Sequence, residues 1–207
     1  MAKLYYRYGA MNSGKTTNLL QVAYNYEERD QKVILLKASI DTKGEDKVVA
    51  RVGLERKVDY LIDDKDSIID TIKNDLSSIN CILVDEVQFL TEEQIFELWV
   101  ITKKHDIPVI AYGLRTDFKT NTFNGSHGMF RFADEFQELE TICRCGEKAR
   151  FNARIINGKF VNEGSSVAID GENEISYESL CGKCYLEKVY CYDIEKSFIS
   201  LFLWYNY

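Results

Sequence analysis

Apolar runs alternate with amphipathic segments along the first 140 residues of this 207-residue chain. Four short runs, bounded by polar residues, predict buried strands at 3–9, 32–38, 81–86 and 107–113. Apolar residues at helical spacing predict helices at 14–29, 66–76 and 91–105. Buried strands separated by helices are typical of a mostly parallel sheet covered on both faces, which makes this an α/β fold.

The helix predicted at 91–105 carries its own start signal. Thr91 is a suitable N-cap, and Gln94 three residues later completes a capping box. The single proline, Pro108, opens the strand that follows this helix.

The pattern changes near residue 140. Glycines and cysteines become frequent, and the strands predicted in RFNARIINGKFV are short. We therefore predict a first domain at 1–140, a small second domain at 141–192 and a C-terminal tail at 193–207. The apolar end of the tail, SFISLFLWYNY, is expected to pack against the protein or a sister subunit.

Composition narrows the possible partners. The formal net charge is −7, which disfavours non-specific binding to nucleic acid because such binding needs a basic surface. No apolar run reaches the roughly 18 residues of a membrane-spanning helix, and MAKLYYRYGA leads straight into a glycine loop rather than a signal peptide. We expect a cytoplasmic protein without a membrane partner.

The first candidate for chemistry is the segment 9–16. It fits the phosphate-binding pattern G-x-x-x-x-G-K-[ST] and lies between a predicted strand and a predicted helix. In such a loop, backbone N–H groups and a helix start surround phosphate oxygens. A lysine reaches the β- and γ-phosphates, and a hydroxyl holds Mg²⁺. The predicted ATP-binding residues are Gly9, Ala10, Met11, Asn12, Ser13, Gly14, Lys15 and Thr16.

Two acids follow the strand predicted at 81–86. Asp85 would lie at the carboxyl end of a buried strand, where ligands bind in open α/β sheets, and would hold Mg²⁺ with Thr16. Glu86 could accept a proton from an attacking hydroxyl or water. A charged strand end and a solvated loop acid are the simpler interpretations of the two residues. The phosphate acceptor stays open, since water would make an ATPase and a substrate hydroxyl a kinase.

Four of the six cysteines form two pairs, Cys143 with Cys145 and Cys181 with Cys184, separated by residues 146–180. Two pairs separated by a loop are typical of a structural tetrahedral zinc site, although the first pair is C-x-C and buried reduced cysteines remain an alternative. Cys191 fits the site less well, and Cys81 is predicted to be core packing. His127, in a predicted glycine-flanked loop, receives no catalytic role.

Five segments in order resemble the zinc-containing cytosolic (type II) thymidine kinases, with most similarity to the bacterial branch. They are AMNSGKTTNLLQVAYNYEER, DEVQF, YGLRTDF, TICRCG and YESLCGKCY, and the resemblance covers roughly residues 3–190. It implies a RecA-like P-loop fold with a zinc-stapled lasso domain. It also implies transfer of the ATP γ-phosphate to the thymidine 5′-hydroxyl, a homotetramer, and inhibition by thymidine triphosphate (dTTP).

The resemblance also implies roles for individual residues. Glu86 is the implied catalytic base. Asp85, Glu86, Val87 and Gln88 extend the implied ATP site. The lasso backbone would read the base edge, and a tyrosine would close over thymine. The implied nucleoside-binding residues are Met11, Gln88, Phe89, Leu114, Phe118, Ser166, Val167, Ala168, Ile169, Asp170 and Tyr177.

Two other functions compete with a nucleoside kinase. A DNA-stimulated ATPase of recombinase or helicase type would also have the DEVQ segment. However, the chain has little room for a second ATP-binding domain, and its acidic charge disfavours a DNA track. A zinc-stapled binding module without catalysis would not need Lys15, Asp85 and Glu86 together.

Overall fold

The computed structural model describes residues 1–41, 44, 46–165 and 174–191. The chain forms two compact units. The first contains Met1–Arg115 and Thr122–Leu139, and the second contains Thr116–Asn121 and Glu140–Tyr207. The tail predicted at 193–207 lies outside the described residues. No helix in the described ranges is long and apolar enough to cross a membrane.

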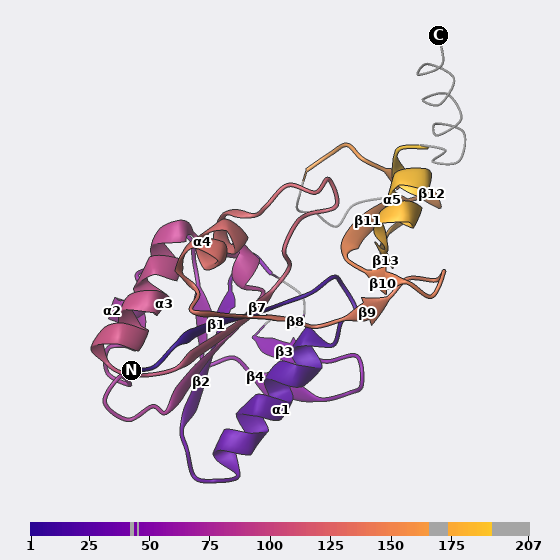
Figure 1. Cartoon of the computed structure of the whole chain (residues 1–207). Coiled ribbons are helices and arrows are strands. Elements are labelled where there is room, and N and C mark those ends of the chain that lie inside the picture. The colour runs from indigo at the N-terminus through magenta and orange to yellow at the C-terminus, as the bar shows by residue number, and fades with distance from the viewer. Residues whose placement is uncertain (42–43, 45, 166–173, 192–207) are drawn as a thin grey trace. The chain divides into compact units, whose positions relative to one another are not determined.

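A six-stranded sheet in the order β5-β2-β6-β7-β1-β8 is the centre of the first unit (Figure 1). All five strand pairs in it are parallel. The predicted α/β fold is therefore confirmed, including four strands expected from the apolar runs. The strands are β1 (Leu4–Tyr8), β2 (Val33–Ala38), β5 (Tyr60–Ile62), β6 (Cys81–Asp85), β7 (Val109–Gly113) and β8 (Glu135–Glu138).

Helices cover both faces of this sheet (Figure 1). Helix α1 (Lys15–Glu27) buries Leu19, Leu20 and Ala23 on one face, in a cluster with residues of β2, β6 and β7. Helices α2 (Ile68–Ile72), α3 (Glu92–Lys104) and α4 (Asn124–Phe132) cover the other face, where the larger core cluster lies. Thr91 caps α3, and the predicted capping box with Gln94 is present.

Helix α2 is shorter than the predicted range 66–76. After Ile72 the chain continues in turns, with Asp75 N–H bonded to the Ile72 carbonyl and Ser78 N–H to the Asp75 carbonyl. Asn, Asp and Ser side chains compete with helical hydrogen bonds and favour such turns. The Asp75 carboxylate also accepts hydrogen bonds from Lys32 and Tyr60, which fixes the turn against neighbouring segments.

The loop predicted around His127 is wrong, because His127 lies inside α4. Its flanking glycines allow close packing instead of a loop. A Cβ added to Gly125 would lie 2.2 Å from the Val87 carbonyl oxygen, and one added to Gly128 would lie 3.1 Å from Ile95. The His127 ring contacts the Glu92 carboxylate at 2.8 Å on the surface.

Short antiparallel strands account for most of the remaining elements. In the first unit, β3 (Lys47–Val49) pairs with β4 (Glu55–Lys57). In the second unit, β9 (Thr141–Ile142) pairs with β10 (Lys148–Ala149), while β11 (Phe151–Ile156) pairs with β12 (Lys159–Val161) and β13 (Ile175–Leu180). Helix α5 (Gly182–Val189) packs on this sheet through Tyr185, stacked on Phe151 with ring centroids 5.1 Å apart.

The Asp134 carboxylate joins the start of β1 to the end of α3, and we predict that it stabilises the fold at neutral pH. It accepts hydrogen bonds from Leu4 N–H at 2.8 Å and from the Lys103 ammonium at 2.7 Å. Partial burial opposes ionisation, but these two partners outweigh it and lower the pKa of Asp134. Its contribution is therefore present above the unfolded pKa and lost as pH falls through the lowered folded value.

Asp134→Asn should cost about 1 kcal/mol of unfolding free energy at pH 7, because one charged hydrogen bond to Lys103 is lost. Urea titrations at pH 7 and pH 3 measure the difference, which should shrink at the lower pH. Glu55→Gln is the control, since its ion pair with Lys47 is about half exposed. Equal destabilisation by Asp134→Asn at both pH values would contradict the assignment.

Candidate active site and metal centre

The loop after β1 has the backbone that its phosphate-binding pattern predicts. Asn12 and Gly14 adopt left-handed conformations with φ of 64° and 77°, and α1 begins directly afterwards at Lys15. A Cβ on Gly9 would lie 2.3 Å from the Leu139 carbonyl oxygen, so only glycine fits there. The sequence therefore closes a tight turn with backbone N–H groups at a helix start, as anion binding requires.

Two side chains of this loop suit a phosphate. Lys15 is 8 % exposed, and its ammonium donates to the carbonyls of Gly9 at 3.3 Å and Ala10 at 2.9 Å. Ser13 carries a buried hydroxyl oxygen that has no hydrogen-bond partner within the described part of the chain. Such groups are costly to bury alone, so a phosphate oxygen here would satisfy them.

Asp85 ends β6 on the sheet face that α1 covers, and β7 separates its strand from β1. Burial, and then the nearby carboxylates of Glu86 and Asp41, raise the pKa of Asp85 to about 7. The Lys15 charge and the Glu86 backbone N–H act in the opposite direction. A nearby cation would favour the ionised form of such a carboxyl group.

Lys37 is a buried cation that the sequence interpretation missed. It is 1 % exposed, it is the Cα register partner of Asp85, and its ammonium lies 3.2 Å from the Asp41 carboxylate. A lysine inside the otherwise apolar run VILLKA was the available signal, because lysine is almost never fully buried without a partner.

Glu86 leaves the strand in a left-handed conformation, with φ of 48°, just before the 3₁₀ turn η1 (Val87–Phe89). Its carboxylate accepts a hydrogen bond from the Gln88 amide at 2.5 Å. The same amide group accepts from Leu114 N–H at 3.0 Å. Gln88, which is 2 % exposed, thus fixes the Glu86 side chain against the end of β7.

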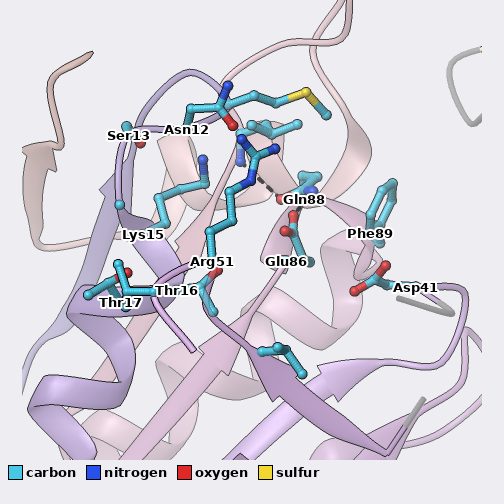
Figure 2. A pocket seen from close by; sticks show the side chains of 15 residues that line it. Asn12, Ser13, Lys15, Thr16, Thr17, Asp41, Arg51, Glu86, Gln88 and Phe89 are labelled. Carbon is cyan, nitrogen blue, oxygen red and sulfur yellow. Dashed lines mark hydrogen bonds between the residues drawn. The ribbon is translucent and has the colours of Figure 1, made fainter. Parts of the chain in front are cut away.

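Residues of the phosphate-binding loop line a cavity of about 400 Å³ together with Glu86 and Gln88 (Figure 2), and this volume lies within the size range of small-ligand sites. Gly9, Ala10 and Asp85, which were predicted as site residues, are not part of its lining. Figure 2 shows Lys15 and Thr16 entering from the loop side, with Glu86, Gln88 and Asp41 opposite them. Val87 does not line the cavity, because its side chain is fully buried in the core. The lining includes the predicted residues Met11, Asn12, Ser13, Gly14, Lys15, Thr16, Glu86, Gln88, Phe89 and Leu114, together with Thr17, Asp41, Val49, Arg51 and Val52.

Arg51 and Asp41 were not predicted as site residues. They belong to the segment between β2 and β5 that carries the β3–β4 hairpin, which has no apolar periodicity long enough to place it. Polar residues beyond the end of a parallel strand were the only signal.

The remaining nucleoside-binding candidates belong to the second unit. Phe118 is 2 % exposed, and Tyr177 on β13 is half-buried. Ser166–Asp170, predicted to read the base edge, lie outside the described residues, so their role stays a prediction.

The four predicted cysteines come together within the second unit as a cluster that could hold a metal ion. The sulfur atoms of Cys143, Cys145, Cys181 and Cys184 all lie within 4.8 Å of one another, and those of Cys145 and Cys181 are 3.6 Å apart. Four thiolates about 2.3 Å from one tetrahedral ion would be about 3.8 Å apart. The arrangement therefore fits a metal ion with four sulfur ligands, and no coordination position is left open.

Local backbone shapes this cluster. Gly146, with φ of 94°, turns the chain between Cys145 and β10. Burial of Cys143 opposes ionisation of its thiol, but hydrogen bonds from the backbone N–H groups of Cys145 and Cys181 lower the pKa of Cys143 to about 7. Contact with the Cys145 sulfur is the main reason that the pKa of Cys184 rises to about 12. Bringing four sulfurs together thus discourages full ionisation, which a bound cation would reverse. Cys81, in contrast, is packed in the core as predicted.

A phosphate-binding loop after β1 and two acids after β6 define a P-loop nucleotide-binding protein. The profile of the thymidine kinase family matches residues 2–185. A thymidine kinase of Shewanella oneidensis is 46 % identical over 194 residues, which cover 92 % of this chain and all of the relative. A thymidine kinase of Francisella tularensis subsp. holarctica is 42 % identical over 197 residues, with 92 % and 100 % coverage. The chain therefore belongs to the thymidine kinase family, as its resemblance to the bacterial members indicated.

These matches do not favour the competing DNA-stimulated ATPase. Among solved structures, a DNA replication initiation factor matches 67 % of this chain and 40 % of its own, at 19 % identity and a TM-score of 0.41. A similarity this low identifies neither function nor partner.

The close contact between α4 and η1 generates a prediction about the position of Glu86. Gly125→Ala would place a Cβ 2.2 Å from the Val87 carbonyl and 2.9 Å from that of Leu90, so the backbone beside Glu86 must move. We expect a stability loss of roughly 1–3 kcal/mol, as for other overpacked sites, and a fall in turnover. Gly182→Ala is the control, because its Cβ would meet Phe151 at an ordinary 3.6 Å. Equal melting temperatures of Gly125→Ala and wild type would refute the close contact.

Proposed function

We propose that this protein transfers the γ-phosphate of ATP to the 5′-hydroxyl of thymidine and releases ADP and dTMP. The observation that supports this proposal most directly is that Lys15 of the phosphate-binding loop and Glu86 line the same cavity. A cation for the transferred phosphate and an oriented carboxylate that can accept a proton suit phosphoryl transfer to a hydroxyl. Membership of the thymidine kinase family supports thymidine as the phosphate acceptor that provides this hydroxyl.

ATP would be held mainly by the loop. Its N–H groups, the Ser13 hydroxyl and the Lys15 ammonium would contact the phosphates. Mg²⁺, held by Thr16 and Asp85, would neutralise charge on the phosphates when bound. Lys15 would then leave the carbonyls of Gly9 and Ala10 for phosphate oxygens, exchanging one set of hydrogen bonds for a stronger charged set.

Glu86 would act as the general base. As the thymidine 5′-oxygen bonds to the γ-phosphorus, the bond from that phosphorus to the ADP oxygen breaks, and the hydroxyl proton passes to the Glu86 carboxylate. The hydrogen bond from Gln88 orients this carboxylate. Because the acid is held by a neighbour that is itself bonded to Leu114 N–H, little reorganisation is needed when the substrate enters.

The nucleoside would lie against Met11, Gln88, Phe89 and Leu114 of the cavity. We propose Phe118, Tyr177 and the backbone of 166–170 as further contacts. Thymine offers an acceptor at O4 and a donor at N3, and cytosine reverses both. Deoxycytidine should therefore be rejected strongly, because buried backbone groups would be left unpaired.

The metal in the four-cysteine cluster is proposed to be structural zinc, since a closed set of four thiolates suits that ion. Feedback inhibition by dTTP, a homotetramer and a cytoplasmic location are proposed from the family resemblance. Neither nucleic acid nor a membrane is proposed as a partner.

The proposed function is tested by transfer of labelled phosphate from ATP to thymidine, with deoxycytidine and single-stranded DNA as alternative additions. Glu86→Gln keeps the shape of the side chain and removes its basicity. Its turnover should fall by about 10²-fold or more, the usual scale for general base catalysis. Thymidine affinity should change little.

Two outcomes would contradict this proposal. A Glu86→Gln protein that retains half of its turnover would exclude Glu86 as the base. ATP hydrolysis that DNA stimulates, without transfer to thymidine, would favour the competing ATPase.

Zinc is predicted to support nucleoside binding rather than ATP binding. Cys181 caps the start of α5, and Tyr185 one turn later donates to the Phe118 carbonyl at 2.5 Å. Loss of the metal should therefore disturb Phe118. Cys184→Ser should lose the stoichiometric zinc of the wild type and weaken thymidine binding about tenfold or more, since the site must be ordered on each binding event. ATP affinity should be nearly unchanged.

Metal analysis of protein purified without chelator, and separate titrations with thymidine and ATP, measure these effects. Cys191→Ser is the matched control, because Cys191 is exposed and outside the cluster. Wild-type protein without zinc would refute the assignment. A simultaneous loss of both affinities would show that the metal supports the whole fold instead.

A further inference from the structure

A buried arginine in the second unit joins the two aromatic residues that are proposed to contact the nucleoside. Arg154 lies on β11 and is 3 % exposed. Its Cα register partner on β13 is Tyr177. Burying a guanidinium is expensive unless hydrogen bonds and nearby aromatic faces compensate, so the contacts that hold it indicate its purpose.

These contacts converge on the nucleoside-binding candidates. The guanidinium carbon lies 3.8 Å from the centre of the Phe118 ring and 5.4 Å from that of the Tyr177 ring. Arg154 Nε donates to the Tyr177 hydroxyl at 2.9 Å. The first distance is a close stacking contact, which fixes the Phe118 ring plane, and the hydrogen bond fixes the reach of the Tyr177 side chain.

The same guanidinium holds the backbone beside these rings. Arg154 Nη1 donates to the Ser165 carbonyl at 2.6 Å. Lys119 donates to the preceding carbonyl, that of Gly164, at 2.8 Å, and its ammonium lies 5.7 Å from the centre of the Phe118 ring. Two cations near one aromatic ring thus bind two consecutive carbonyls. The hydrogen bonds from Arg154 and Lys119 to the carbonyls of Ser165 and Gly164 do not involve the cysteine cluster. Metal binding alone therefore does not account for the position of this backbone.

Sheet stability does not require a charge at this position. Strand β11 pairs with β12 and β13 through its backbone, and an apolar side chain of similar size would fill the same space at lower desolvation cost. What a charged, planar side chain adds is simultaneous stacking on a ring and directed hydrogen bonds to a hydroxyl and a carbonyl. We propose that Arg154 is a positioning residue for nucleoside recognition, which presets Phe118, Tyr177 and the Ser165 backbone. This inference rests on the proposed function.

Arg154→Met tests the proposal, because methionine keeps much of the apolar volume and removes the planar charge. We expect the thymidine Kd and KM to rise about tenfold, with kcat at saturating thymidine within about threefold of wild type and ATP affinity unchanged. Arg154→Lys should be intermediate, since a lysine keeps the charge but not the planar donor set. The control is Lys188→Met, which removes a cation 5.2 Å from the Phe160 ring and 3.1 Å from Glu178 without touching Phe118 or Tyr177.

Tyr177→Phe keeps the inference testable if Arg154→Met does not fold. It removes only the hydroxyl that accepts from Arg154, and it should raise the thymidine Kd about threefold. Combined with Arg154→Lys, its effect should be less than the product of the two single effects, because both changes remove the same hydrogen bond. Zinc content and melting temperature of each variant report whether the unit has kept its fold.

The measurements separate this inference from the proposed function. A folded, zinc-containing Arg154→Met protein with wild-type thymidine Kd would overturn the inference while transfer by the wild type stands. Wild type that binds thymidine but transfers no phosphate would refute the kinase, and the Kd comparison would still decide the role of Arg154. Equal loss of thymidine and ATP affinity in Arg154→Met would also overturn a positioning role.

Discussion

The parallel direction of the central strands is the constraint on which the active site depends. Because all strands of the sheet run the same way, the segments that follow β1, β2 and β6 meet where the carboxyl ends of the strands lie. The phosphate-binding loop follows β1, Asp41 lies beyond β2, and Asp85 ends β6 directly before Glu86. In an antiparallel sheet, successive segments would instead lie at opposite ends of the strands. The sheet thus brings cations and acids together without a dedicated scaffold for either.

Placing three acids close together creates repulsion, which two buried lysines offset in part. Asp41, Asp85 and Glu86 repel one another, which contributes to the raised pKa of Asp85. Buried Lys15 and Lys37 supply opposite charge from the loop and from β2. Of the two, Lys37 lies 3.2 Å from the Asp41 carboxylate, whereas the Lys15 ammonium donates to the carbonyls of Gly9 and Ala10. The charge of Lys37 thus offsets that of Asp41, and exchange of the two carbonyls for phosphate oxygens is part of the proposed binding of ATP.

The sequence predicted best those features that a local pattern encodes completely. The apolar runs of β2 and β6 could only be buried strands, and the capping box at Thr91 fixed the start of α3. His127 was misplaced because Gly125 and Gly128 look like loop residues, whereas their role is to let α4 approach η1 and α3 closely. Asp41, Arg51 and Arg154 were missed for another reason. Arg154 is distant in sequence from its partner Phe118. Asp41 is only four residues from Lys37, but the lysine lies in a strand and Asp41 beyond its end, where that spacing predicts no contact.

The second unit shows how a small core can position a binding surface. Its apolar cluster includes two of the cysteines and Tyr185, so the proposed metal site is part of the core rather than an addition to it. Cys181 caps the start of α5, and Tyr185 of this helix donates a hydrogen bond to the Phe118 carbonyl. Arg154 reaches the ring of the same Phe118 from β11. The Phe118 carbonyl is thus held from the helix that begins at the cysteine cluster, and the Phe118 ring is held by a buried charge. If Phe118 contacts the nucleoside as proposed, holding both its backbone and its ring in advance lowers the entropy that binding would otherwise cost.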